Sequence, residues 1–170
     1  MGLSREVPLP FTVSHAAAAW PIRAALGGRV VLSALVVGTL APDAEYFVHM
    51  GPVRTISHTF PGLFLMDLPV GLALLWLFHR LYKRSFALLL PEALAARLLP
   101  EAERPFRWGP PGRFLAICAS IWAGSATHVL WDAFTHRRSA VEHGWTWLTA
   151  PVFRAFGMDF AVHSVLQNLS

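Results

Sequence analysis

The 170-residue sequence is 55% hydrophobic and only 14% charged, whereas a soluble domain is typically about 45–50% apolar and about 25% charged. This composition argues against an ordinary soluble domain and favours a single membrane-embedded domain over residues 1–170. The net charge of +4 comes from arginines that flank apolar segments, so we interpret it as a signal of membrane topology and expect no nucleic-acid partner.

The first two predicted helices are short. Ser14 is a suitable N-cap for a helix that should stop at Gly27. At about 1.5 Å per residue, this helix cannot cross a hydrocarbon core of about 30 Å. The next apolar run covers residues 30–40 and ends at the Ala-Pro-Asp sequence of residues 41–43. It can continue through residues 46–48.

Two longer apolar runs are the candidates for membrane-spanning helices. The first covers residues 62–82, is free of charge over residues 68–78, and ends at a His-Arg pair. The second covers residues 114–134. Its small residues would let a neighbouring helix pack closely; these are Ala119, Ala123, Gly124, Ser125 and Ala126.

The remaining segments predict loops and interfacial structure. Residues 51–61 form a polar loop, and residues 85–112 form a basic loop whose amphipathic stretch at 86–99 is expected to lie in the membrane interface. Residues 145–156 are rich in Trp, which is typical of an interfacial belt. Residues 160–166 begin another apolar helix without a C-cap signal, which suggests a chain truncated at the C-terminus before a final spanning helix.

The basic residues predict the topology. Seven of the 14 Lys and Arg residues lie between positions 80 and 113, and Arg23 and Arg29 bring this side to nine against five on the other. The bias places the 80–113 loop in the cytoplasm. Tracing the helices back and forth then gathers six ionisable residues at the extracytoplasmic end: His15, Asp43, His58, Asp67, His128 and Asp132. We therefore expect an all-α, polytopic, multi-pass protein of the inner (cytoplasmic) membrane, with a His/Asp cluster at one end of the helix bundle.

The strongest local signal for chemistry is the pair His128 and Asp132. They are one helical turn apart and share a face, so both can reach one metal ion. Ionisable residues within apolar spans are costly and usually functional. His136 is a further turn along, about 12 Å from His128 in helix rise. We expect it to support the ligands or to bind a second ion.

The other candidates each have a second explanation. Asp43 either binds a metal or caps the helix after the proline. Glu45 is a carboxylate that could act as the general base if it is not a ligand. His15 and His58 are either ligands or ordinary surface histidines. Asp67 is expected to be the N-cap of a spanning helix.

As a set, these residues indicate a metal site. Mixed imidazole and carboxylate ligands suit Zn²⁺, Mn²⁺ or Fe²⁺ better than Ca²⁺ or copper. More than three such ligands could hold two ions and activate a water molecule for hydrolysis. Paired histidines across two long helices, as haem binding would need, are not present, and neither are the Gly-x-Ser-x-Gly, His-Glu-x-x-His and phosphate-loop motifs.

Four motifs follow one another along the chain: Phe-Thr-Val-Ser-His (11–15), Ala-Pro-Asp-Ala-Glu-Tyr-Phe (41–47), Ser-His-Thr-Phe-Pro-Gly (57–62) and His-Val-Leu-Trp-Asp-Ala-Phe-Thr-His (128–136). In this order they resemble a bacterial membrane family of unknown function that is similar to the YdjM-like membrane-bound metal-dependent hydrolases. The resemblance covers nearly the whole chain and extends more distantly to zinc-dependent phospholipase C enzymes. It implies five metal positions, namely His15, Asp43, His58, His128 and Asp132.

These observations lead to two functional hypotheses. The first is a metal-dependent hydrolase, with zinc as the expected metal, that acts on a phospholipid or another phosphoester at the extracytoplasmic membrane face. Glu45 and His136 are its candidate catalytic residues. The alternative is a non-enzymatic metal-binding, transport or assembly protein that uses the same ligands without turnover. In both cases membrane lipid is the expected partner.

Overall fold

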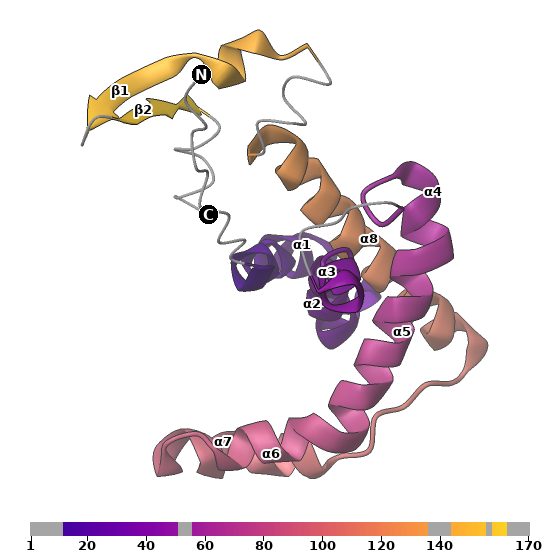
Figure 1. Ribbon diagram of the computed structural model, residues 1–170. Coiled ribbons are helices and arrows are strands. Elements are labelled where there is room, and N and C mark those ends of the chain that lie inside the picture. The colour runs from indigo at the N-terminus through magenta and orange to yellow at the C-terminus, as the bar shows by residue number, and fades with distance from the viewer. Residues whose placement is uncertain (1–11, 51–55, 136–143, 156–157, 163–170) are drawn as a thin grey trace.

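The computed structural model describes residues 12–50, 56–135, 144–155 and 158–162, and these are mostly helical (Figure 1). The first part of the chain forms a 3₁₀ segment at Thr12–Ala18, α1 at Ala19–Leu26, a 3₁₀ turn at Gly27–Arg29, α2 at Leu32–Leu40 and α3 at Ala44–His49. The helix α1 ends at Gly27, as predicted, and this glycine has a φ of 57° that favours residues without a Cβ atom. Ser14 lies inside the 3₁₀ segment and Ala18 occupies the N-cap position of α1, so the prediction that Ser14 is the N-cap of the first helix is wrong.

The second part forms one long helical run and a further long helix. The run Phe60–Leu88 comprises α4, α5 and α6, at Phe60–Gly62, Leu68–Leu77 and Lys83–Leu88, joined by π-helical turns at Leu63–Asp67 and Phe78–Tyr82. It is followed by α7 at Glu92–Glu103 and α8 at Pro111–Thr135. Two helices, Phe60–Leu88 and Pro111–Phe134, are long and apolar enough to cross a membrane. They contain the two runs that the sequence predicts.

The helix α2 packs against both α5 and α8, and these three form the core (Figure 1). Hydrogen bonds link the start of α2 to Ser120 near the middle of α8 and the end of α2 to His128 further along α8, so the two helices run in the same general direction. The helix α5 runs in the opposite direction. The buried side chains between the three are Ala34, Val37, Leu75, Ile117 and Ile121.

Two glycines let α2 and α8 approach closely. A Cβ atom on Gly38 would overlap the backbone carbonyl of Ile121, and one on Gly124 would overlap the carbonyl of Leu35. Nearby, the Ser125 hydroxyl donates a hydrogen bond of 2.9 Å to the carbonyl of Gly38. The predicted close packing on the small residues of α8 is confirmed at Gly124 and Ser125.

Asp67 is not the helix cap that the sequence predicts. The helical run begins at Phe60, where the Thr59 hydroxyl caps it by accepting a hydrogen bond from the Gly62 amide. Proline is well tolerated in this first turn, and Pro61 occupies it. Asp67 therefore lies inside a continuous helix, is fully buried, and makes no capping hydrogen bond.

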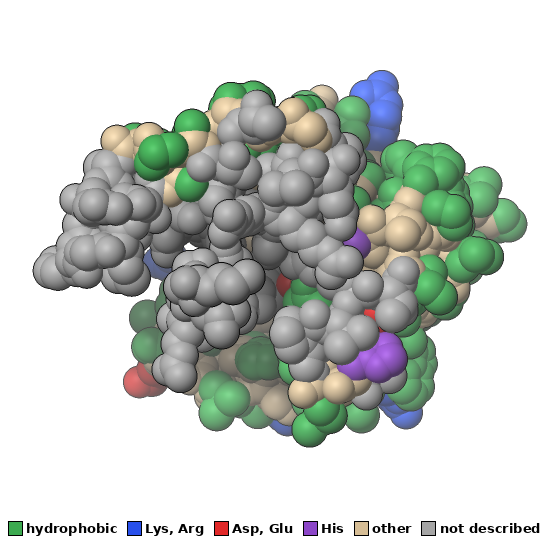
Figure 2. Space-filling model, turned by 45° about the horizontal axis from the view of Figure 1, so that its top comes forward, with side chains coloured by type: hydrophobic (Ala, Val, Ile, Leu, Met, Phe, Trp, Pro, Cys, Tyr) green, Lys and Arg blue, Asp and Glu red, His purple; other side chains and the backbone are tan. Residues whose placement is uncertain are grey.

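The predicted basic loop contains helices. Its amphipathic stretch falls on α6 and α7, which cross the lower end of α5 in Figure 1, and α7 has no buried residue. In Figure 2, hydrophobic side chains cover much of the described part of one face of the molecule. The predicted continuation of residues 30–40 into 46–48 is interrupted, because α2 ends at Leu40 and α3 starts after a turn.

The fold is not all-α. After a 3₁₀ turn at Thr146–Thr149, the strands β1 at Pro151–Ala155 and β2 at Met158–Ala161 pair antiparallel, with Arg154 opposite Asp159. The helix predicted from residue 160 is therefore wrong at residues 160 and 161; residues 163–166 lie outside the described part of the chain. A short apolar run fits a helix or a strand equally well, and here backbone pairing with a neighbouring segment decides.

Candidate metal centre

Five polar side chains from four separate segments meet beside the C-terminal half of α8. His15 comes from the 3₁₀ segment at the start of the chain, Asp43 from the turn before α3, and His58 from the residues just before α4. His128 and Asp132 come from α8 itself, one turn apart. The two aspartates and His128 are buried, and His15 and His58 are partly buried.

The nitrogen and oxygen atoms of this cluster lie close together. The Nε2 atom of His128 is 3.3 Å from Oδ1 of Asp43 and 3.6 Å from Oδ2 of Asp132. The Nε2 atom of His58 is 3.9 Å and 3.3 Å from the same two oxygens. On the other oxygen of Asp132, Oδ1, the Nε2 atom of His15 approaches to 3.5 Å. Each aspartate thus lies between imidazole rings.

A backbone carbonyl fixes the orientation of the His128 ring. Its Nδ1 atom is 2.7 Å from the carbonyl oxygen of Thr39. A carbonyl can only accept, so Nδ1 carries a proton and donates it. In the neutral ring, Nε2 is then a lone pair, and this buried atom has no hydrogen-bond partner among the described residues. Metal-binding histidines are commonly held by such a bond from their other nitrogen.

A side-chain relay orients His58 in the same way. Ser57 donates its hydroxyl proton to Oε2 of Glu45 at 2.6 Å, and its amide donates to the same oxygen at 3.2 Å. The Ser57 oxygen is then left to accept from Nδ1 of His58, which is 2.9 Å away. His58 therefore also presents its Nε2 lone pair to the aspartates, and this nitrogen too lacks a hydrogen-bond partner within the described part of the chain.

The arrangement fits a divalent metal ion. Nitrogen lone pairs that face carboxylate oxygens repel them, unless a cation or a proton lies between. Four ligand atoms placed tetrahedrally at 2.0–2.2 Å from an ion are about 3.3–3.6 Å apart, close to the 3.3–3.9 Å separations of His58 and His128 from the aspartates. Two overlapping triplets of donors could each hold an ion: His15, His128 and Asp132 form one, and Asp43, His58 and His128 form the other. Within each triplet, the ligand atoms lie within 4.8 Å of one another.

Asp67 lies next to this centre. It is fully buried, and neither of its carboxylate oxygens has a hydrogen-bond partner in the ranges that the structure describes. It lies within electrostatic range of His128, Glu45 and Asp43. An ionised carboxylate buried without donors is costly, so Asp67 adds to the demand for a cation. In the sequence, the feature that indicates this role of Asp67 is a carboxylate within an apolar span. Its position shortly before a proline, which suggests a helix cap, is not informative here.

The structure brings together all five residues that the sequence nominates as metal positions. Glu45 lies behind His58 and contacts it through Ser57, and the prediction that it is a general base stays untested. His136 lies outside the described residues. The roles of Ser57 and of the Thr39 carbonyl have no sequence signal beyond the Ser-His pair, because they depend on how distant segments pack.

A protein-family model described as a domain of unknown function, DUF4184, matches residues 9–170. The match covers nearly the whole chain, including all five clustered residues. No curated protein and no solved structure matches the chain.

Proposed function

This chain belongs to the DUF4184 family, and we propose that it is a membrane-bound, metal-dependent hydrolase that acts on phosphoesters, with membrane phospholipid as the favoured substrate class. One observation carries the proposal. Two histidines, His58 and His128, have their Nδ1 atoms held by other groups and direct both Nε2 atoms at Asp43 and Asp132.

The donor set favours Zn²⁺, with Mn²⁺ or Fe²⁺ as alternatives, because it combines imidazole nitrogen with carboxylate oxygen. His58, His128, Asp43 and Asp132 would hold the first ion. His15 lies on the other oxygen of Asp132, so this carboxylate could bridge to a second ion or to a substrate position beside His15.

When bound, the ion would polarise a phosphoryl oxygen and make a water molecule nucleophilic. The residues of the chain supply orientation. The Glu45–Ser57 pair holds the ring of His58, and the last turn of α2 holds that of His128. Catalysis requires ligands held to within a fraction of an ångström, and these bonds would provide that rigidity.

The long helices support a location in the membrane. The run Phe60–Leu88 and the helix α8 expose large apolar side chains along their length, such as Leu65 at 75% and Leu115 at 67% exposure. In water, such exposed apolar surface would be unfavourable, whereas a bilayer would cover it. Both helices would span the inner membrane of a bacterium. If the excess of Lys and Arg at the opposite end of the helices marks the cytoplasmic face, the centre would lie on the extracytoplasmic side.

Aromatic side chains next to the centre support a lipid substrate. Phe47, Phe60 and Trp131 follow closely on cluster residues in the sequence and are exposed. Aromatic rings of this kind favour the level of the lipid headgroups. A phosphoester carried by a membrane lipid would therefore be presented at the depth of the metal centre. The relation to YdjM-like hydrolases, inferred from the motifs, agrees with this reaction class.

A non-enzymatic metal protein is the second candidate. Four protein donors around one ion close a tetrahedron, which is typical of structural zinc sites, whereas catalytic sites keep a position open. If His58, His128, Asp43 and Asp132 all bind the same four-coordinate ion, no position would remain for a substrate. The ion would then serve stability, transport or assembly.

The test is metal analysis followed by an activity assay. The protein is purified in detergent, its metal content is measured by mass spectrometry, and hydrolysis of bis(p-nitrophenyl) phosphate and of a short-chain phospholipid is followed with the metal removed and restored. Hydrolysis that depends on the metal supports the hydrolase. Tightly held metal without hydrolysis supports the second candidate. A folded protein that neither retains nor takes up metal overturns both.

A further inference from the structure

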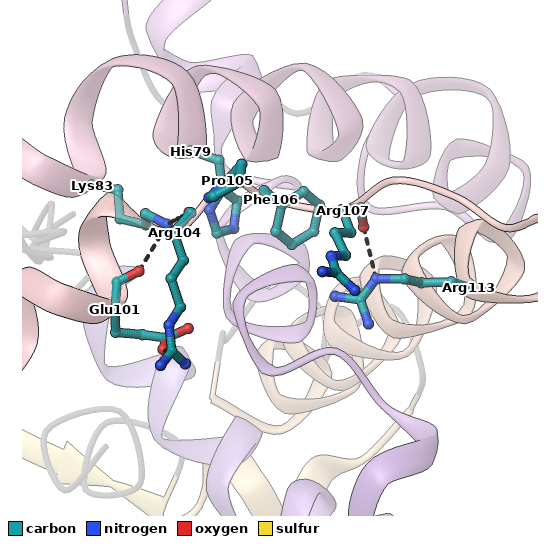
Figure 3. A pocket seen from close by; sticks show the side chains of 8 residues that line it. All are labelled: His79, Lys83, Glu101, Arg104, Pro105, Phe106, Arg107 and Arg113. Atoms are coloured by element: carbon teal, nitrogen blue, oxygen red, sulfur yellow. Dashed lines mark hydrogen bonds and ion pairs between the residues drawn. The ribbon is translucent and has the colours of Figure 1, made fainter.

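A cavity lined largely by charged residues lies far from the metal centre, where the chain passes from α5 through α6 and α7 to the start of α8 (Figure 3). Its volume is about 510 Å³, within the usual range of about 300–1,000 Å³ for ligand pockets. Four cations line it, namely Lys83, Arg104, Arg107 and Arg113, and Glu101 is the only acid among the lining residues. With a neutral histidine, the lining carries a net charge of +3.

The cations are held in place by backbone groups and keep donors to spare. The Lys83 ammonium donates to the carbonyls of Glu101 at 3.1 Å and of Arg104 at 2.7 Å, which uses two of its three protons. Arg113 donates from Nε to the Arg107 carbonyl at 2.7 Å, and its guanidinium carbon lies 5.7 Å from the centre of the Phe106 ring. Its terminal N–H groups can still bind a ligand.

The one acid is already engaged. Glu101 accepts a bond of 2.8 Å from Arg104, so it compensates one cation and leaves the others. In Figure 3 this pair lies on one side of the cavity, and Arg107 and Arg113 lie on the other. Between them, the His79 ring stacks on Phe106 with 3.9 Å between ring centres.

His79 supplies a polar atom in need of a partner. Its Nε2 lies 3.0 Å from the Ser33 hydroxyl, whereas its Nδ1 is buried and has no hydrogen-bond partner in the described ranges of the chain. When Ser33 donates to Nε2, Nδ1 carries the proton. The base of the cavity then offers a donor in addition to the surrounding cations. A lining with this charge favours an anion as the ligand.

The position of the cavity separates it from the metal centre. Along α8, Arg113 precedes His128 by about 22 Å, and along the other long helix His79 follows Asp67 by about 18 Å, at about 1.5 Å per residue. The neighbouring helices α6 and α7 expose apolar side chains, including Phe86, Leu88 and Leu94. An interfacial position of these helices would hold the cavity at the headgroup level of the other membrane face.

We propose that this cavity is a phosphate-binding site that takes the phosphodiester of an anionic lipid headgroup or a free phosphate ion. Guanidinium groups bind phosphate oxygens through paired, charge-assisted hydrogen bonds. Two arginines and a lysine can therefore each contact a different oxygen of one phosphate group. A divalent cation would be repelled by the positive lining. The site is independent of the metal centre and of the function proposed for it.

The proposal is tested on the full chain in neutral detergent by calorimetric titration with two probes, dihexanoylphosphatidylglycerol and inorganic phosphate. The double variant Arg107→Gln, Arg113→Gln removes two cations from the cavity. The matched control Arg80→Gln, Arg97→Gln removes the same charge from exposed positions outside it. We expect affinity to fall about tenfold or more in the cavity variant and less than about twofold in the control.

Binding of the lipid alone identifies the headgroup as the source of the phosphate, and binding of inorganic phosphate, with or without the lipid, identifies the phosphate itself. Failure of both probes to bind, or an equal loss in both double variants, overturns the site. Circular dichroism checks the fold. Arg107→Gln alone replaces the double variant if that protein does not fold, since among the described residues only the Arg107 carbonyl, which the substitution keeps, takes part in a hydrogen bond.

Discussion

The Nδ1 atom of His128 donates a hydrogen bond of 2.7 Å to the carbonyl oxygen of Thr39. Thr39 belongs to the last turn of α2, where carbonyl groups have no amide partner four residues ahead in the helix. The bond therefore gives the Thr39 carbonyl a hydrogen-bond donor. At the same time it turns Nε2 of His128 towards Asp43 and Asp132. The packing of α2 on α8 and the geometry of the metal centre are thus parts of one arrangement.

The first prediction concerns the ligands on α8. The double variant His128→Ala, Asp132→Ala should lose at least about 90% of the bound metal, because the variant removes the donor shared by both triplets and the carboxylate between the histidines. Metal content per protein, measured by mass spectrometry, checks this. His79→Ala, a histidine outside both triplets and outside the relay, is the control. Equal metal content in the double variant and the control would show that His128 and Asp132 do not bind the metal.

The second prediction concerns Ser57. Ser57→Ala breaks the contact between Glu45 and His58 and removes the hydroxyl donor to the Glu45 carboxylate, which keeps only the backbone amide of residue 57 as a donor from this residue. Because groups that orient metal ligands typically account for about 10–100-fold in affinity, we expect zinc affinity to fall by roughly that factor, as measured by competition with a chromophoric chelator. Ser85→Ala on exposed α6 should leave it unchanged. An unchanged affinity in Ser57→Ala would mean that the relay does not orient His58.

The third prediction concerns the crossing of α2 and α8. Gly124→Ala places a methyl group against the backbone of Leu35 and Thr39, so it should lower the free energy of unfolding by about 1–3 kcal/mol or more. Gly112→Ala in the same helix meets no atom within 4 Å and is the control. Thermal unfolding in detergent, followed by circular dichroism, compares the two. Similar midpoints for both variants would contradict the close approach.

The fourth prediction concerns Asp67, and its two readouts have opposite signs. Asp67→Asn removes a buried negative charge beside His128 and Asp43. Without metal, the variant should be more stable than the natural chain, because the desolvation of the carboxylate is relieved. Its affinity for a divalent ion should fall roughly tenfold, because the attraction to the cation is lost. A change of the same sign in both measurements would show that Asp67 acts on the fold and not on the charge of the centre.

Much of the site could be predicted without coordinates. His128 and Asp132 share a helix face because of their spacing, and this holds wherever the helix packs. The gathering of His15, Asp43 and His58 near them follows from short helices and long apolar runs that alternate in direction. The same reasoning predicts that Asp67 lies at this end of the molecule, next to the cluster. The prediction that it is a helix cap is wrong.

Other features depend on contacts between distant parts of the chain. The helix containing Asp67 starts earlier than its proline signal indicates, because Thr59 provides a better cap. The strands β1 and β2 form through pairing with each other, which a short apolar run does not specify. The basic loop folds into α6 and α7 and closes a cavity around Lys83, Arg107 and Arg113, whereas the sequence indicates only their charge.

Composition and helical spacing are local properties, so they already specify the helical character of most of the chain, its apolar spans, and the set of side chains that gather at one end. Which atoms of those side chains are available depends instead on how the helices pack. The nitrogen that His128 presents depends on a carbonyl group 89 residues away, and that of His58 on a carboxylate supplied by α3 through Ser57. Hydrogen bonds between distant segments exist only once the helices are packed, and they set the chemistry of the centre.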